Sequence, residues 1–157
     1  MSKMILSPFF KEICKSSDLQ IHCTDDTIVL KDSKSDACII ISQDEYYTDS
    51  TKEKAFSEYT VLFSTQHRHF NSLEEAEEYV RLILSDEVLP VEFFDSDRPR
   101  FGGEIRKDEF DVLTPESLAK RFGYAAGSLL SLEFEVHSWS GKYDIKRMKF
   151  SELYKKQ

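Results

Sequence analysis

The sequence is poor in the residues and patterns that mark specialised classes of protein. Only 5 of its 157 residues are glycine and 4 are proline, which excludes a collagen-like chain and most low-complexity sequences. No apolar run in the sequence approaches the roughly 18–20 residues of a membrane span. The apolar residues near the N-terminus are interrupted by Ser7 and Pro8, so they are too short for the core of a signal peptide. We therefore expect a soluble protein that stays in the cytoplasm.

Cysteine is scarce as well. Cys14, Cys23 and Cys38 are an odd number at irregular spacing, and no two of them form a C-x-x-C pair. This pattern favours neither a disulfide framework nor a zinc knuckle, and it fits a reducing compartment. Because no catalytic or metal-binding signature occurs elsewhere, we expect a non-catalytic protein with no cofactor and no metal.

The chain does contain enough apolar material for one compact domain. Hydrophobic residues make up 40% of the sequence and aromatic residues 13%, and a domain commonly spans about 100–200 residues. Basic residues number 21 against 29 acidic ones, which gives a net charge of −8. This charge opposes non-specific attraction to nucleic acid and to anionic membranes. We expect residues 1–157 to form a single globular domain.

In the first half of the chain, short β-favouring runs lie between two predicted helices. The predicted strands are Leu19–Cys23, Thr27–Leu30, Ala37–Ile41 and Tyr59–Thr65. One helix is predicted over Pro8–Ser16, and another begins at Ser72, which forms a capping box with Glu75. The polar segment Asp44–Lys54 has no clean period, so we expect an irregular excursion there.

The second half of the chain predicts hairpins around one helix. The predicted strands are Val91–Phe94, Phe101–Arg106, Leu130–Val136 and Tyr143–Phe150, the last with a bulge near Arg147. Thr114 and Pro115 are typical of a helix start, and Gly123 of a helix end. The fold class expected is α+β, with a largely antiparallel sheet and two or three packed helices. A parallel crossover over Tyr59–Phe94 stays open as a variant.

Two segments suggest binding of a small anionic substrate. In an extended segment His67 and His69 project to the same face, as an acid–base or metal-binding pair requires, although a polar loop before the Ser72 helix is the simpler expectation. Arg98 and Arg100 precede Gly102 and Gly103, where backbone N–H groups can cradle an anion. A small enzyme or ligand-binding domain using these residues is the alternative function.

A basic C-terminal segment suggests a third function. Lys142–Gln157 carries six basic and two acidic residues, with Trp139 and Tyr143 nearby. Such a strip can bind nucleic acid through phosphate contacts and stacking. The same lysines also protect the edge of a hairpin, and the negative net charge makes nucleic acid an unfavourable partner.

Two acidic clusters with aromatic residues are the most prominent surface feature expected. In the first, Asp44, Glu45 and Asp49 surround Tyr46 and Tyr47. The second cluster places Asp86, Glu87, Glu92, Asp95 and Asp97 around Phe93 and Phe94. Carboxylates steer a basic partner into contact, and aromatic residues act as desolvated anchors.

A small, acidic α+β protein of this kind is similar in general character to the bacterial immunity proteins that neutralise polymorphic or contact-dependent inhibition toxins. The resemblance extends over the whole chain, and the two acidic clusters are its support among individual residues. It implies a tight complex with a basic partner, a cognate toxin such as a nuclease, whose active site is occluded by binding alone. The expected partner-binding residues are Asp44, Glu45, Tyr46, Tyr47, Asp49, Glu92, Asp95 and Asp97.

Overall fold

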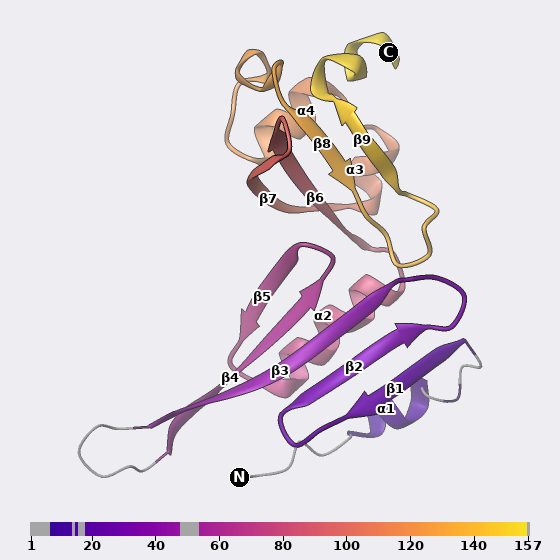
Figure 1. Cartoon of the computed structure of the whole chain (residues 1–157), viewed down its shortest axis with the longest axis vertical. Helices are drawn as coiled ribbons and strands as arrows, with labels where there is room; N and C mark the ends of the chain where they lie inside the picture. Colours follow the sequence, from indigo (N-terminus) through magenta and orange to yellow (C-terminus); the bar gives the residue numbers. More distant parts are fainter. Residues whose placement is uncertain (1–6, 14, 16–17, 48–53, 157) are drawn as a thin grey trace. The chain divides into compact units, whose positions relative to one another are not determined.

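The computed structural model describes residues 7–13, 15, 18–47 and 54–156, and contains two antiparallel sheets (Figure 1). Contacts divide the chain into two compact units, Met1–Arg81 and Leu82–Gln157, which we name the N-terminal unit and the C-terminal unit. The α+β class with antiparallel strands is confirmed. The expectation of a single domain stays a prediction, because compactness of contacts does not measure whether the units unfold together.

The N-terminal unit is a five-stranded meander in the order β1-β2-β3-β4-β5. Its strands are β1 (Leu19–Cys23), β2 (Thr27–Asp32), β3 (Cys38–Tyr47), β4 (Lys54–Phe63) and β5 (Gln66–Phe70). Helix α1 (Pro8–Ile13) lies in this unit, and α2 (Leu73–Leu84) begins in it and ends three residues beyond Arg81. The Ser72 hydroxyl accepts a hydrogen bond from the Glu75 N–H at 3.2 Å, so the predicted start of α2 is confirmed.

One face of this sheet is the core of the N-terminal unit. Its buried side chains are Ile28, Leu30, Ile39, Ile41, Val61 and Phe63. Figure 1 shows α1 and α2 on the same side of the sheet. The Arg68 guanidinium lies 4.9 Å from the Tyr79 ring centroid of α2, and the Arg81 guanidinium lies 4.7 Å from the ring centroid of Phe9 in α1. Val61 of β4 and Arg68 of β5 are register partners, so their side chains point to the same face of the sheet. Both helices therefore cover that face.

The C-terminal unit is a four-stranded sheet in the order β7-β6-β8-β9. Its strands are β6 (Val88–Asp95), β7 (Arg98–Arg106), β8 (Glu133–Val136) and β9 (Ile145–Lys149). Its helices are α3 (Lys107–Asp111), α4 (Pro115–Arg121) and the 3-10 helices η1 (Ala126–Leu129) and η2 (Phe150–Lys156). The described residues thus contain four α-helices and two 3-10 helices, more than the two or three helices expected.

Aromatic side chains form the centre of the C-terminal core. Phe93 is fully buried, and its ring lies 4.6 Å from that of Phe101 and 5.3 Å from that of Phe122, measured between centroids. A Cβ on Gly103 would lie 2.7 Å from Cε1 of Phe122, so glycine allows this ring to approach β7 closely. Gly103 therefore serves the close packing of Phe122 against β7.

Several expectations about elements need correction. The irregular excursion predicted over Asp44–Lys54 is wrong for residues 44–47, because β3 continues to Tyr47. Residues 48–53 of that segment lie outside the described residues. His67 and His69 lie on β5 and not in a loop, since they pair with Leu62 and Thr60 of β4. The crossover proposed over residues 59–94 is absent, because β4 and β6 belong to different sheets.

Two details of β8 and β9 follow from their pairing. Residues 130–132 precede β8 in a turn, so the predicted strand begins later, at Glu133. Phe134 pairs with Met148, and Val136 with Ile145. Two residues of β9 therefore lie opposite one residue of β8, which confirms the predicted bulge near Arg147.

Candidate functional site

A polar network lies on the face of the N-terminal sheet opposite α1 and α2. The Tyr46 hydroxyl donates a hydrogen bond to Glu58 Oε2 at 2.8 Å, and His69 Nδ1 lies 3.1 Å from Glu58 Oε1. Thr60 Oγ1 is 3.1 Å from the same histidine nitrogen. Asp44 is the register partner of Glu58 across β3 and β4, so the two carboxylates occupy neighbouring positions on this face.

The carboxylates of this network alter the acidity of the tyrosine. The pKa of Tyr46 is raised above its ordinary value, first by the hydrogen bond to Glu58 and then by the negative charges of Glu58 and Asp44. The phenol loses its hydrogen bond and meets two negative charges when it ionises. The neutral tyrosine, 41% exposed, is therefore stabilised as a hydrogen-bond donor beside two acids.

The structure brings part of the first acidic cluster together. Asp44 and Tyr46 share the open face, while alternation along β3 places Glu45 on the other face. Tyr47 lies in β3 at a register shift, and Asp49 lies outside the described residues. Glu58 is not among the residues predicted from the sequence. The alternating pattern of β4 was the available signal, because pairing of β3 with β4 places Glu58 opposite Asp44.

The second acidic cluster takes a different form from the one expected. Phe93 is 0% and Phe94 6% exposed, so both are core residues of the central strand β6 and not surface anchors. Asp95 lies exposed at the end of β6, and Asp97 lies exposed in the turn to β7. Glu92 is half-buried, and its Oε2 has no hydrogen-bond partner among the described residues.

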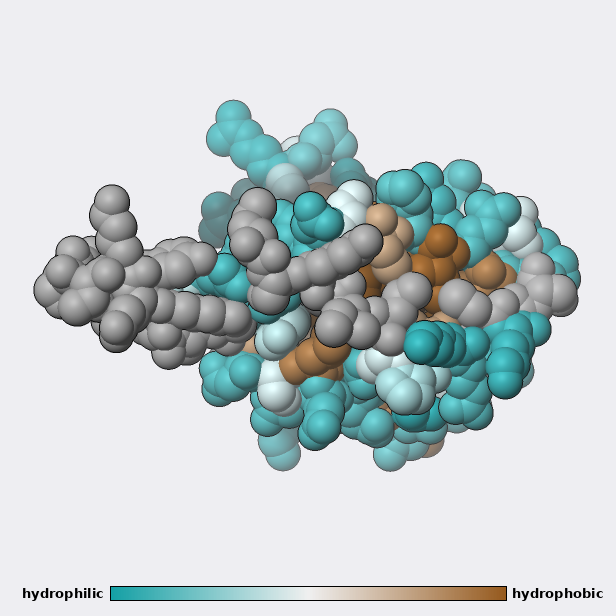
Figure 2. All heavy atoms as spheres, turned by 90° about the horizontal axis from the view of Figure 1, so that it is seen from below, coloured by the Kyte–Doolittle hydropathy of each residue, from teal (hydrophilic) through white to brown (hydrophobic). Residues whose placement is uncertain are grey.

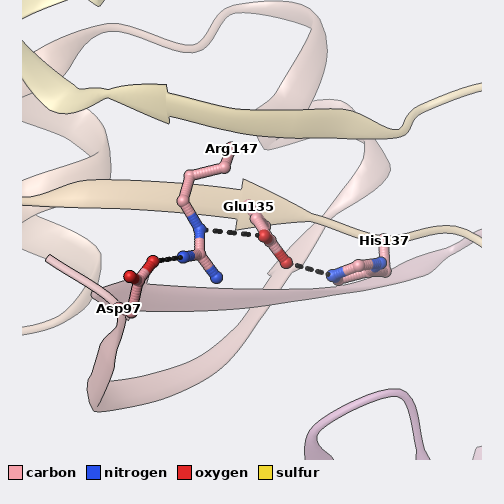
Figure 3. Close-up of polar contacts among 4 residues, drawn as sticks. All are labelled: Asp97, Glu135, His137 and Arg147. Atoms are coloured by element: carbon pink, nitrogen blue, oxygen red, sulfur yellow. Dashed lines mark hydrogen bonds and ion pairs between the residues drawn. The ribbon is translucent and has the colours of Figure 1, made fainter.

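Asp97 belongs to an ion-pair chain of the C-terminal unit that the sequence did not predict (Figure 3). Arg147 Nη1 lies 3.2 Å from Asp97 Oδ1, and Arg147 Nε lies 3.0 Å from Glu135 Oε1. The other oxygen of Glu135 lies 3.1 Å from His137 Nε2. The guanidinium carbon of Arg147 also lies 3.6 Å from the ring centroid of Phe94. The charged groups of this ion-pair chain thus have partners within the protein.

The residues of the alternative, small-molecule site lie in different units. His67 and His69 are in the N-terminal unit, with ring centroids 5.3 Å apart. Residues 98–103 are in the C-terminal unit, where Gly102 and Gly103 are part of β7. The left-handed backbone found at Gly123 and Gly141 is not found at these two glycines, so β7 does not form the anion cradle considered. Within the part of the chain that the structure describes, no three His, Cys, Asp or Glu side chains are placed to hold a metal ion.

The open face of the N-terminal sheet contains a cavity. Its volume is about 350 Å³, and its walls are formed by Gln20, Ile21, His22, Val29 and Lys31. None of the residues predicted to bind a partner or a substrate lines it. Figure 2, which views the molecule from below relative to Figure 1, shows mostly hydrophilic side chains with hydrophobic ones gathered in small areas.

Charge is unevenly divided between the units. Residues 1–81 hold 9 basic and 15 acidic residues, a net charge of −6, whereas residues 82–157 hold 12 and 14, a net charge of −2. The basic C-terminal segment is spread over β9 and η2, and its Arg147 is already paired with Asp97 and Glu135. The strongest excess charge of either sign is therefore the negative charge of the N-terminal unit.

Comparisons with family models, curated proteins and solved structures find no significant match to this chain. No helix among the described residues is both long enough and apolar enough to cross a membrane.

Proposed function

We propose that the chain is a non-catalytic module that binds a basic protein partner, and that the partner is a toxin which the chain neutralises in the bacterial cytoplasm. The observation that carries this proposal is the Asp44–Glu58 pair beside the exposed Tyr46. An exposed tyrosine next to paired carboxylates fits a lysine or arginine of a partner, since the ring and the charges both attract a cation. The net charge of −6 on residues 1–81 likewise favours a positively charged partner.

Inhibition needs no chemistry from this chain in the proposed mechanism. Negative charge raises the rate of encounter with a basic surface, and the complex then blocks access to the toxin's active site. A nuclease fits this scheme well, because its cleft is basic in order to bind phosphates. An acidic face competes for the same groups.

The first experiment uses the full chain as bait in a lysate of its native host, at low and at physiological salt. We expect one basic protein at a stoichiometric level, partly retained at the higher salt. Co-expression of that protein with the wild-type chain is expected to restore growth, whereas expression of that protein alone is expected to be toxic. Recovery of no stoichiometric partner, or of a partner that is not toxic, would contradict the proposed function.

A further inference from the structure

We propose that the partner docks on the face of the N-terminal sheet opposite α1 and α2, where it presents an apolar side chain and a lysine or arginine about 13 Å apart. This inference rests on the proposed function for the sign of the partner's charge, and it adds the place, spacing and orientation of the contact. The spacing is that of four residues along a strand at about 3.3 Å each. This is the distance along β3 from Ile40, in a row of apolar side chains, to Asp44, at the acidic end of the same face.

The apolar row crosses three neighbouring strands. Val29 of β2 pairs with Ile40 of β3, and Ile40 pairs with Leu62 of β4, so the three side chains point to the same face. His22 of β1 and His67 of β5 continue the row at its two ends. Val29 and Ile40 are half-buried and Leu62 is 37% exposed. No helix of the N-terminal unit covers this row among the residues described, since α1 and α2 lie on the opposite face.

Such a row is unusual on the outer face of an antiparallel sheet, which is commonly polar. The cavity of about 350 Å³ adjoins it at Val29 and provides room for a side chain of the partner. An apolar group placed there would remove Val29 and the neighbouring aliphatic side chains from water. The row therefore favours a partner with an apolar anchor.

The two ends of the face differ in charge, and this difference fixes the orientation. Along β3, Asp44 lies four residues beyond Ile40, opposite Glu58 of β4. On the other side of the row, Lys31 of β2 is the register partner of Cys38. Two carboxylates directly opposite each other are unfavourable in an isolated sheet. Tyr46 and His69 already contact the two oxygens of Glu58, so a cation of the partner binds chiefly to Asp44 and offsets the remaining repulsion. The partner's lysine or arginine therefore lies at the Asp44 end, away from Lys31.

Other occupants fit this face less well. A second copy of the chain would bring another unit with a net charge of −6 against the first. An anionic membrane would meet the same repulsion. A basic protein surface satisfies both the apolar row and the acidic end.

The test is an NMR titration of the full-length, isotope-labelled chain with two synthetic peptides of identical composition. The first, acetyl-TLTTTRT-amide, places leucine and arginine on the same side of an extended chain, about 13 Å apart. The control, acetyl-TLTTRTT-amide, places them on opposite sides. We expect saturable shifts of the amides of Val29, Ile40, Leu62 and Asp44 with the first peptide, and at least fivefold weaker binding of the control. Equal binding of both, shifts confined to other surfaces, or no shifts would overturn the proposal.

Substitutions at Leu62 extend the test to the natural partner. Leu62→Lys removes an apolar contact and repels a cation, so we expect at least tenfold weaker binding of the protein recovered from the lysate. Leu62→Thr keeps a good strand-forming residue, and a smaller loss of affinity is expected. The matched control is Val112→Lys in the C-terminal unit, where the valine is 72% exposed. An unchanged affinity of both Leu62 variants would overturn the docking face.

The outcomes separate this inference from the proposed function. Partner binding that tolerates Leu62→Lys would leave the function standing and remove the docking face. Specific peptide binding without any toxic partner in the lysate would support the docking face and contradict the proposed function. A wild-type chain that sediments as a dimer, with the Leu62→Lys variant a monomer, would identify a second copy as the occupant and overturn the proposal.

Discussion

At the scale of single residues, the environment of each side chain decides between a binding role and a structural one. Tyr46 and Phe94 both lie beside acidic residues in the sequence, but Tyr46 is 41% exposed and Phe94 only 6%. Arg147 covers Phe94, whereas the Tyr46 hydroxyl bonds to Glu58 at the surface. The prediction of a surface aromatic residue is therefore correct for Tyr46 and wrong for Phe94, which is a core residue.

Gly103 provides a test of packing in the C-terminal unit. A Cβ at this position would lie 2.7 Å from the Phe122 ring, so Gly103→Ala is expected to lower the free energy of unfolding by about 1–3 kcal/mol through overpacking. Urea denaturation measures this change. Gly127→Ala is the control, because a Cβ there meets nothing within 4 Å. A Gly103→Ala variant as stable as the wild type would show that Phe122 does not approach β7 as described.

The Tyr46–Glu58 hydrogen bond predicts a measurable change in titration. Glu58→Gln removes a negative charge and the strongest acceptor of the Tyr46 hydroxyl, so the pKa of Tyr46 is expected to fall toward its ordinary value of about 10. Because folding raises this pKa, the stabilisation it brings is complete below the ordinary value and is lost as the pH rises through the folded value. NMR of labelled tyrosine follows the titration. Unchanged titration in the variant would contradict the hydrogen bond.

At the scale of elements, local sequence signals predicted where helices begin better than how strands extend. The start of α4 is the clearest case, since Thr114 Oγ1 accepts from the Ser117 N–H at 3.0 Å and the Ser117 hydroxyl accepts from the Thr114 N–H at 2.9 Å. Both bonds involve residues three apart, so the sequence alone contains the information. Thr114→Ala is expected to cost about 1 kcal/mol, measured by thermal and urea unfolding. No loss of stability would show that the cap contributes nothing.

The end of β3 and the start of β8 were harder to predict, because their structure depends on distant partners. Asp44 is in a strand because β4 pairs with it, although its polar neighbours favour a loop. Apolar and polar residues alternate over 130–132 as in a strand, but these residues form a turn. Pairing of β8 with β6 and β9 begins only at Glu133. Pairing of Asp44 with Glu58, and hence the candidate site, follows from strand register, which a single sequence does not specify.

The ion-pair chain across β8 and β9 is predicted to be structural. Asp97 is fully exposed, so Asp97→Ala should leave the free energy of unfolding almost unchanged. Arg147→Ala removes the Glu135 contact and the Phe94 stacking together, and a larger loss of about 1–2 kcal/mol is expected. Urea denaturation of the two variants makes the comparison. Equal effects of the two substitutions would contradict this assignment.

At the scale of the whole molecule, two compact units share one chain. The prediction of a single domain requires one calorimetric transition whose calorimetric and van't Hoff enthalpies agree. Two separated transitions would show that the units are independent domains. In either case the proposed binding face lies within the N-terminal unit.

The affinity of the recovered partner for two charge-reversed chains decides whether the acidic end of the N-terminal sheet forms the binding site. One carries Asp44→Lys and Glu58→Lys, and the other carries the same change of charge at Asp25 and Asp36, two exposed residues outside the candidate site. Isothermal titration calorimetry is expected to show at least about tenfold weaker binding for the first, since loss of an engaged charge pair costs about 2–5 kcal/mol. Asp44→Lys alone, at an exposed position, should act in the same direction with little effect on folding. Equal affinity of all these chains for the partner would contradict the claim that the acidic end of the N-terminal sheet forms the binding site.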